Sequence, residues 1–141
     1  MELQVKKLDP EAKLPTRAHA DDAGLDLYAL EESILEPGAR LAVRTGIALA
    51  IPKGFTGLVW DKSGLAAKAG IKTMGGVVDA GYRGEVQVIV VNIGPLPYTV
   101  EKGAKIAQLL VQKVELPEIC EVSELDDTLR GEGGFGSTGT H

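Results

Sequence analysis

The chain has 141 residues, of which 44% are hydrophobic and only 4% aromatic, and its formal net charge is −5. A chain of this length forms one domain, whose core must be built from aliphatic side chains. The negative charge disfavours a nucleic-acid polymer as partner, because binding a phosphate backbone needs a positive face, although a small anion can still bind where a few cations and amides meet.

The sequence also bears on location and metal chemistry. No segment approaches the roughly 20 consecutive apolar residues of a membrane span, and residues 1–13 lack the apolar run of a signal peptide. The single cysteine, Cys120, can form neither an internal disulfide nor a zinc cluster. We expect a cytoplasmic protein with no membrane partner, in which oxygen atoms hold any metal ion.

Short apolar runs between turn residues predict an all-β domain. In chain order, we expect strands at residues 3–8, 25–29, 41–51, 56–60, 71–78, 85–92 and 105–114, with a candidate strand at 118–122. Residues 63–70 (SGLAAKAG) instead predict a short helix, which Ser63 can cap and Gly70 can end.

Two of these strands, at 85–92 and 105–114, are apolar on both faces. A strand with one solvated face alternates between apolar and polar residues. Burial of both faces in so small a domain indicates contact with another subunit, so we expect a homo-oligomer.

The first candidate site segment is DDAGLDLYA at residues 21–29. If Leu25 and Leu27 face the core, Asp26 points the other way. Acidic side chains near a polyphosphate usually act through Mg²⁺, often with waters between. The alternative is a strand carboxylate that simply faces solvent.

The second segment is DKSGLAAK at residues 61–68. The charge of Lys62, the hydroxyl of Ser63 and the free amides at the start of the short helix can together bind an anion. The alternative is an ordinary capped turn.

The third segment is GGVVDAGYRGE at residues 75–85, which we expect to hold a hairpin loop over 79–84 with Gly81 and Gly84 free to adopt positive φ. A carboxylate on such a loop, Asp79, can orient and deprotonate a water, with Tyr82 as an apolar wall beside it. Alternatively, Asp79 caps the turn and Tyr82 packs beneath it.

Gln108, in the apolar segment AKIAQLLV, is the fourth candidate. Its amide needs partners when buried, so it either contacts a ligand or makes a structural hydrogen bond.

The last segment is the glycine-rich tail RGEGGFGSTGTH at residues 130–141. Arg130 offers two prongs for phosphate oxygens, Phe135 a flat face for a base, and Ser137-Thr138 with nearby amides a nest for an anion. The alternative is a disordered terminus.

Five segments, in this order, resemble the trimeric deoxyuridine triphosphatase (dUTPase) family: AGLDLYA, KSGLA, GGVVDAGYRGE, GAKIAQLL and RGEGGFGSTG. The resemblance implies an all-β, jelly-roll-like β-barrel at residues 1–129 with one short helix, followed by a flexible C-terminal lid at 130–141. It also implies a homotrimer with sites at the subunit interfaces and Mg²⁺-assisted hydrolysis of dUTP to dUMP and pyrophosphate. Such a reaction limits uracil in DNA and supplies dUMP for thymidylate synthesis.

The resemblance also implies roles for single residues. Asp79 holds and activates the attacking water, Tyr82 stacks beneath the deoxyribose, and Asp26 acts on the metal ion through water. The backbone of residues 73–78 reads uracil, which includes Thr73, Gly76 and Val78. The remaining substrate contacts are Lys62, Ser63, Gly64 and Gln108 on the phosphates, and, from a neighbouring subunit, Arg130, Gly136, Ser137 and Thr138 on the terminal phosphates with Phe135 over the base.

One departure stands out, because the family usually has arginine, often after proline, where this chain has Asp61-Lys62. Lysine keeps the charge but loses the two-pronged contact with phosphate. Two rival functions are a dCTP deaminase of the same superfamily and a non-catalytic trimer. The deaminases carry a catalytic glutamate where this chain has Ile89, and a non-catalytic trimer would have lost Asp79 or the tail.

Overall fold

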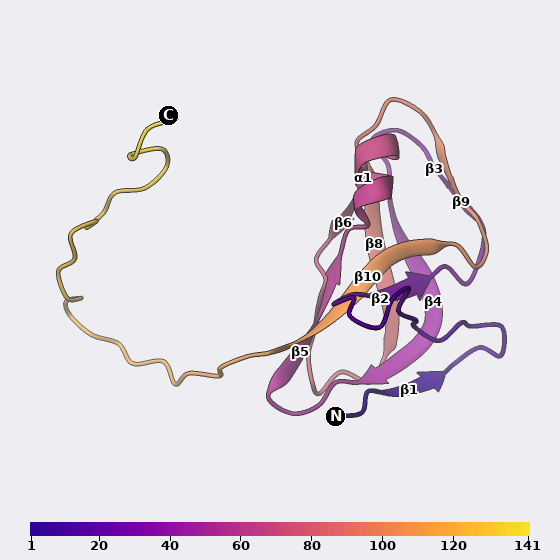
Figure 1. The fold of residues 1–141 in the computed structure, drawn as a ribbon, viewed down its shortest axis with the longest axis horizontal. Helices are drawn as coiled ribbons and strands as arrows, with labels where there is room; N and C mark the ends of the chain where they lie inside the picture. The colour runs from indigo at the N-terminus through magenta and orange to yellow at the C-terminus, as the bar shows by residue number, and fades with distance from the viewer.

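The computed structural model describes residues 1–141 and consists of short strands, one helix and connecting segments (Figure 1). The elements are β1 (Gln4–Lys7), β2 (Leu25–Tyr28), β3 (Ser33–Leu35), β4 (Arg40–Ala50), β5 (Phe55–Trp60), α1 (Ser63–Ala69), β6 (Ile71–Met74), β7 (Val77–Val78), β8 (Glu85–Asn92), β9 (Tyr98–Val100) and β10 (Lys105–Lys113). The expected all-β class with one short helix is confirmed. That helix falls well short of the length needed to cross a bilayer, and there is no other.

The strands form two four-stranded antiparallel sheets and a small two-stranded one. The orders are β1-β4-β8-β6, β2-β10-β5-β7 and β3-β9. Strands that follow one another in sequence often lie in different sheets, as in a jelly roll. No strand of one large sheet pairs with the other, so the sheets stay open instead of closing into a continuous barrel.

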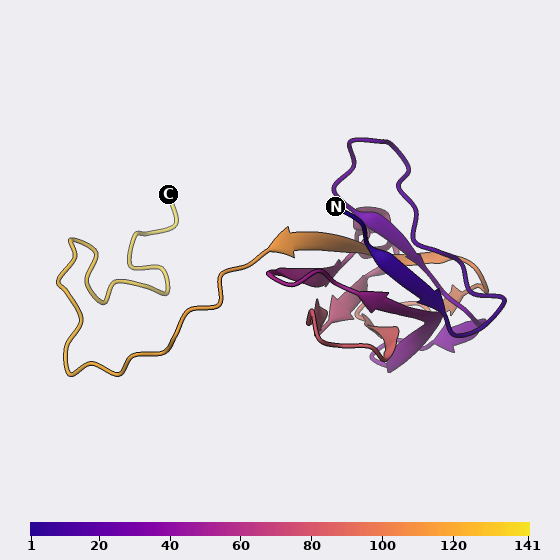
Figure 2. The ribbon, with the colours of Figure 1, turned by 90° about the horizontal axis from the view of Figure 1, so that it is seen from below.

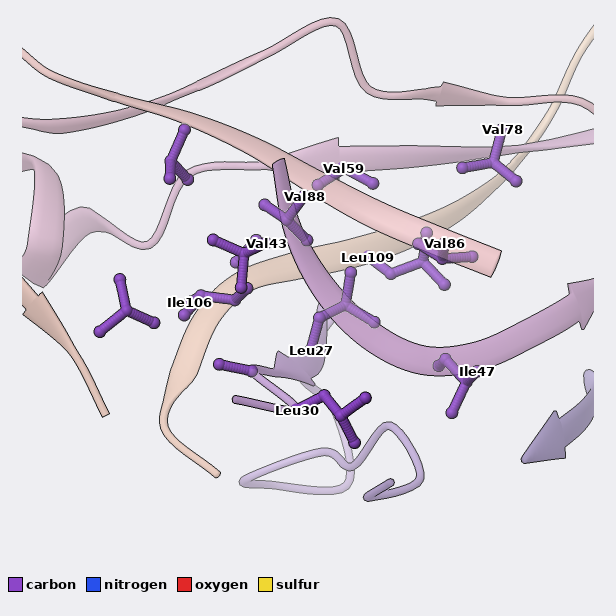
Figure 3. Close-up of a cluster of buried hydrophobic side chains, with 14 of the residues drawn as sticks. Leu27, Leu30, Val43, Ile47, Val59, Val78, Val86, Val88, Ile106 and Leu109 are labelled. Carbon is purple, nitrogen blue, oxygen red and sulfur yellow. The ribbon is translucent and has the colours of Figure 1, made fainter. Parts of the chain in front are cut away.

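Aliphatic side chains from the two large sheets meet between them (Figure 3). Leu27 and Leu109 come from one sheet and Ile47 and Val88 from the other, and all four are almost completely buried. The 19 buried members of this cluster include no aromatic residue, so the expected aliphatic core is confirmed. Burying each leucine stabilises the fold by about 1.5–3 kcal/mol.

The strand expected at 71–78 is broken by Gly75 and Gly76, whose φ values are +68° and +100°. A side chain at position 76 would lie 2.7 Å from the carbonyl oxygen of Val59, so only glycine fits there. The break sends β6 to one large sheet, beside β8, and β7 to the other, beside β5.

The expected hairpin at 79–84 is therefore wrong, because this loop joins strands of different sheets. Gly81 and Gly84 do not adopt positive φ, whereas Gly75 and Gly76 do. Ser63 does not cap α1 either, since the N-cap is Lys62 and no side chain bonds there. Gly70 does end the helix in the left-handed conformation, as expected.

The chain leaves the sheets at Lys113 and runs outward as an arm without regular structure (Figures 1 and 2). The candidate strand at 118–122 is absent. Strands β3 and β9 were not expected, because three residues are too few to show alternation. The proposed boundary at residue 129 stays a prediction.

Candidate functional site

The first hollow of interest, about 520 Å³ in volume, lies where β7 and the loop 79–84 meet β8. Asp79 and Tyr82 both line it, together with Gly76 and Val78. Four residues predicted from the sequence are thus brought together. We call this cavity the first hollow.

Asp79 presents a free carboxylate in the first hollow. The turn that carries it closes through the main chain, where the amide of Tyr82 donates to the carbonyl oxygen of Asp79 at 3.1 Å. The side chain takes part in none of the structure's ion pairs or hydrogen bonds. The carboxylate therefore does not cap the turn and is available to a water or a ligand.

Tyr82 is held in place at the hydroxyl end of its ring. Its hydroxyl donates to the carbonyl oxygen of Glu85 at 2.9 Å. The ring lies over Gly84, where an added Cβ would come within 2.6 Å of the tyrosine Cζ. A rigid aromatic wall beside Asp79 follows from these two contacts.

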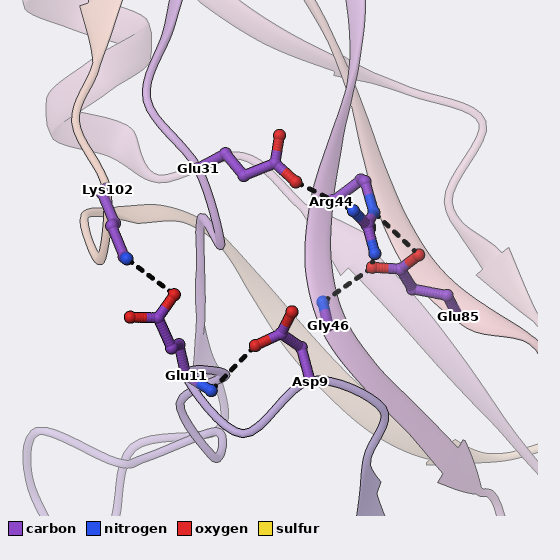
Figure 4. Close-up of polar contacts among 7 residues, drawn as sticks. All are labelled: Asp9, Glu11, Glu31, Arg44, Gly46, Glu85 and Lys102. Atoms are coloured by element: carbon purple, nitrogen blue, oxygen red, sulfur yellow. Dashed lines mark hydrogen bonds and ion pairs between the residues drawn. The ribbon is translucent and has the colours of Figure 1, made fainter.

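Glu85 ties the end of this loop to β4, a link that the sequence did not reveal (Figure 4). Its carboxylate accepts a hydrogen bond from the amide of Gly46 at 2.8 Å and pairs with Arg44 at 3.2 Å. In the register of β4 and β8, Thr45 to Ile47 lie opposite Val86 alone. This bulge turns the Gly46 amide toward Glu85 and so fixes the base of the loop.

A second hollow, about 380 Å³ in volume, lies beside β2, β10 and the start of α1. We call it the second hollow. It gathers five residues predicted from three separate segments of the sequence: Asp26, Lys62, Ser63, Gly64 and Gln108.

Asp26 is buried in the second hollow between two lysines and does not face solvent, so that alternative is wrong. Its carboxylate contacts the ammonium of Lys62 and lies 2.7 Å from that of Lys105. Burial raises the pKa of the Asp26 carboxyl, but hydrogen bonds from Lys105 and Lys62 outweigh it, so the net pKa lies below the usual value. Lys105 was missed because only the pairing of β10 with β2 brings it here.

Asp61 and Lys62 do not pair with each other. Lys62 reaches Asp26, whereas the Asp61 carboxylate accepts bonds from Thr73 and Lys72 on β6. Gln108 donates its amide hydrogen to the carbonyl oxygen of Asp61 at 2.8 Å. The structural interpretation of Gln108 is thus correct, and its side chain also lines the second hollow.

The segment expected to read a base has several main-chain groups that are already hydrogen-bonded within the fold. Thr73 and Val78 are buried, and the carbonyl oxygen of Gly76 accepts a bond from the amide of Val59 at 2.7 Å. Beside this segment, Trp60 and Val77 border a smaller cavity of about 250 Å³.

The tail residues lie in neither hollow. Arg130 bonds within the tail, to the carbonyl oxygen of Gly133 at 2.8 Å, and Phe135 is fully exposed. Gly136, Ser137 and Thr138 are exposed as well. The first and second hollows share no lining residue, so the candidate residues fall into two separate hollows and an arm that lines neither.

A metal ion would find few protein ligands in either hollow. Nowhere do three or more His, Cys, Asp or Glu side chains gather as a metal site. Asp26, with Asp22 at the rim, supplies oxygen atoms of the kind that Mg²⁺ prefers. Both oxygens of Asp26 already contact lysine ammonium groups, so these donors fit a Mg²⁺ ion that is held through waters and a bound anion.

Comparison with known proteins identifies the family to which the chain is similar. The family model for dUTPase matches residues 10–139. The chain is 51% identical to the deoxyuridine 5'-triphosphate nucleotidohydrolase of Mycolicibacterium gilvum (strain PYR-GCK), over 99% of this chain and 96% of that protein. The protein of the same name from Mycobacterium leprae (strain TN) is 52% identical over the same shares.

The solved structures that match this chain are also dUTPases. The dUTPase of Staphylococcus bacteriophage 80alpha with dUPNHPP matches with a TM-score of 0.93 and 32% identity, over 99% of each chain. A mutant dUTPase from phage phi11 of S. aureus, studied for the coordination of a structural Mg(II) ion, matches with a TM-score of 0.83 and 29% identity, over 88% of this chain and 98% of that one.

Proposed function

The chain belongs to the dUTPase family and hydrolyses dUTP to dUMP and pyrophosphate, and we propose that it does so as a cytoplasmic homotrimer with active sites shared between subunits. One observation carries this proposal: the two hollows hold complementary chemistry but share no residue. In the trimer, the first hollow of one subunit meets the second hollow of its neighbour, and an arm covers the junction.

Exposed apolar side chains around the first hollow support the assembly. Val77 and Trp60 are more than half exposed, and Ile89 on the outer face of β8 is 39% exposed. Contact with a second subunit removes this apolar surface from water. The strand that the sequence predicted to be buried on both faces, β8, lies at this surface.

Asp79 is the general base of the proposed mechanism. Asp26, the buried carboxylate of the second hollow, is paired with two lysines, whereas Asp79 has no partner. A free carboxylate can hold a water and accept its proton as the water attacks phosphorus. Attack at the α-phosphorus releases dUMP and pyrophosphate.

Tyr82 and the segment 73–78 select the nucleoside. The Tyr82 ring, fixed by Glu85 and Gly84, forms a wall beneath the deoxyribose that leaves no room for a 2′-hydroxyl. Main-chain groups of residues 73–78, including Gly76 and Val78, hydrogen-bond with uracil.

The second hollow takes the triphosphate. Lys62, Ser63, Gly64 and Gln108 contact its oxygen atoms, and Asp26 would hold Mg²⁺ through water. When bound, Mg²⁺ neutralises charge on the phosphates. The contacts from the arm are Arg130, Gly136, Ser137 and Thr138 on the terminal phosphates and Phe135 over the base.

The mechanism is tested by incubating purified protein with Mg²⁺ and each of dUTP, dCTP, dTTP and UTP, and by running the dUTP reaction in ¹⁸O-water. We expect cleavage of dUTP alone, with the label in dUMP. Label only in pyrophosphate would mean attack at the β-phosphorus and would overturn the placement of Asp79. Formation of dUTP from dCTP would instead identify a deaminase.

A further inference from the structure

We propose that Asp61 is a positioning residue. It holds the base-reading segment 73–78 and Gln108 in place relative to residues 62–64, which follow Asp61 and which we call the phosphate loop. The inference rests on the proposed function for the roles of those two partners. Asp61 lies between the end of β5 and the start of α1, next to Lys62 and Ser63 of the second hollow. It is one of the two residues in which this chain departs from the family pattern.

The carboxylate of Asp61 binds the start of the base-reading segment. One of its oxygens accepts hydrogen bonds from both the amide and the hydroxyl of Thr73, the latter at 2.8 Å. Thr73 is buried, so these donors have no water to replace the carboxylate. Hydrogen bonds to a charged acceptor are also stronger than neutral ones. The position of β6 relative to the phosphate loop is therefore set by this carboxylate.

The anchored strand is followed at once by a glycine turn. Gly75 and Gly76, both at positive φ, separate Thr73 and Met74 from β7. The carbonyl oxygen of Gly76 accepts a hydrogen bond from the amide of Val59, so β5 holds the far end of this turn. The bonds between Thr73 and Asp61 hold its near end, and together these contacts limit how far the base-reading main chain can shift.

The main chain of Asp61 positions the second partner. Its carbonyl oxygen accepts the amide hydrogen of Gln108 at 2.8 Å. On its other side, Gln108 packs against Gly24, where an added Cβ would lie 3.0 Å from the glutamine Cδ. Gln108 is thus held between Gly24 and Asp61, and any shift of Asp61 moves it within the second hollow.

The ion pair between Asp61 and Lys72 is a lesser contributor. The two charges lie 2.7 Å apart, but half of the lysine side chain is exposed. Exposed pairs contribute little because water and salt screen them. Lys72 also donates to the carbonyl oxygen of Thr73 at 3.1 Å. The K72M variant therefore removes the ion pair and this bond but leaves both bonds that Thr73 donates to Asp61.

The test compares D61A, D61N and K72M for kcat and KM with dUTP and with dCTP, alongside the melting temperature. D61A should raise the KM for dUTP about tenfold, the equivalent of one charge-assisted hydrogen bond, and narrow the preference for dUTP over dCTP. D61N keeps an oxygen acceptor for Thr73 and should stay within about threefold of the parent, as should K72M.

Several results would overturn the proposal. A D61A protein with reduced kcat but unchanged KM and base preference would indicate only a loss of folded enzyme. A K72M defect as large as that of D61A would assign the effect to the contacts of Lys72 and not to the bonds that Thr73 donates to Asp61. If D61A does not fold, Thr73→Val, which removes only the hydroxyl donor, must raise KM, and an unchanged KM refutes the proposal. Failure of the parent protein to cleave dUTP would refute the proposed function instead.

Discussion

Apolar side chains are buried in the sheets up to Lys113 but exposed in the arm beyond it. Leu27 and Leu109 in the sheets are 0% exposed, whereas Leu125 in the arm is 85% exposed and Ile119 94% exposed. Burial of apolar surface is the main force that stabilises a fold, so the sheets contain the source of their own stability and the arm does not. The arm can acquire a fixed structure only by contact with something outside its own chain, either a neighbouring subunit or a bound nucleotide.

This comparison predicts that the catalytic base belongs to the part of the chain that forms the sheets. Replacing Asp79 with asparagine should leave assembly and nucleotide binding intact but lower kcat about 10²-fold or more, because an amide is a far poorer base. Steady-state kinetics, size-exclusion chromatography and nucleotide titration measure the three quantities. Near-normal turnover would show that Asp79 has no catalytic role.

Stability should also divide between the two regions. Leu109→Ala removes a core side chain and should lower the free energy of unfolding by about 3 kcal/mol. The same substitution at Leu125 should change it by less than about 0.5 kcal/mol in the isolated subunit. Urea unfolding of both variants provides the measurement, and equal losses would contradict the division.

Deleting residues 130–141 should reduce catalysis and leave stability unchanged. The truncated protein should keep its melting temperature but lose at least about tenfold in kcat, because the lid no longer excludes water from the site. Phe135→Trp offers an independent signal, since its fluorescence should change when a non-hydrolysable dUTP analogue binds with Mg²⁺. The parent protein, with Trp60 alone, is the control, and full activity after truncation would disprove the lid.

Tyr82→Ala tests the wall in the first hollow. Removing the ring should lower the ratio of kcat/KM for dUTP over UTP several-fold, because one small group in a pocket is worth about 1–3 kcal/mol of discrimination. Competition between the two nucleotides measures this ratio directly. If the ratio does not change, another residue excludes the 2′-hydroxyl.

The smallest effect is expected at Lys62. Arginine keeps the charge that faces Asp26 and adds a planar fork suited to phosphate oxygens, so Lys62→Arg should change KM by no more than about threefold. A severe loss would mean that the contact with Asp26 requires the compact ammonium group.

The sequence predicted the longest elements well because their apolar residues repeat over many positions. Strand β8 lies at the expected residues, β10 ends one residue earlier than expected, and β4 is shifted by one residue at each end. The break at Gly75-Gly76 was not predictable, since its cause is the carbonyl of Val59, which is distant in sequence.

For the site, too, local features could be predicted and long-range contacts could not. Motifs within one segment, such as Asp79 with Tyr82, were identified from the sequence and lie together in the structure. Contacts that depend on strand pairing were not identified. Lys105 reaches Asp26 only through the register of β10 with β2, and Glu85 reaches Gly46 only through the bulge in β4.

The separation of the two hollows has a consequence for genetics. If neighbouring subunits join unlike hollows, as we propose, a chain with a damaged first hollow still carries an intact second hollow. Two inactive variants, one altered at Asp79 and the other at Gln108, would then restore activity when their subunits are unfolded and reassembled together. A cell carrying both alleles would then have an activity that neither allele provides alone.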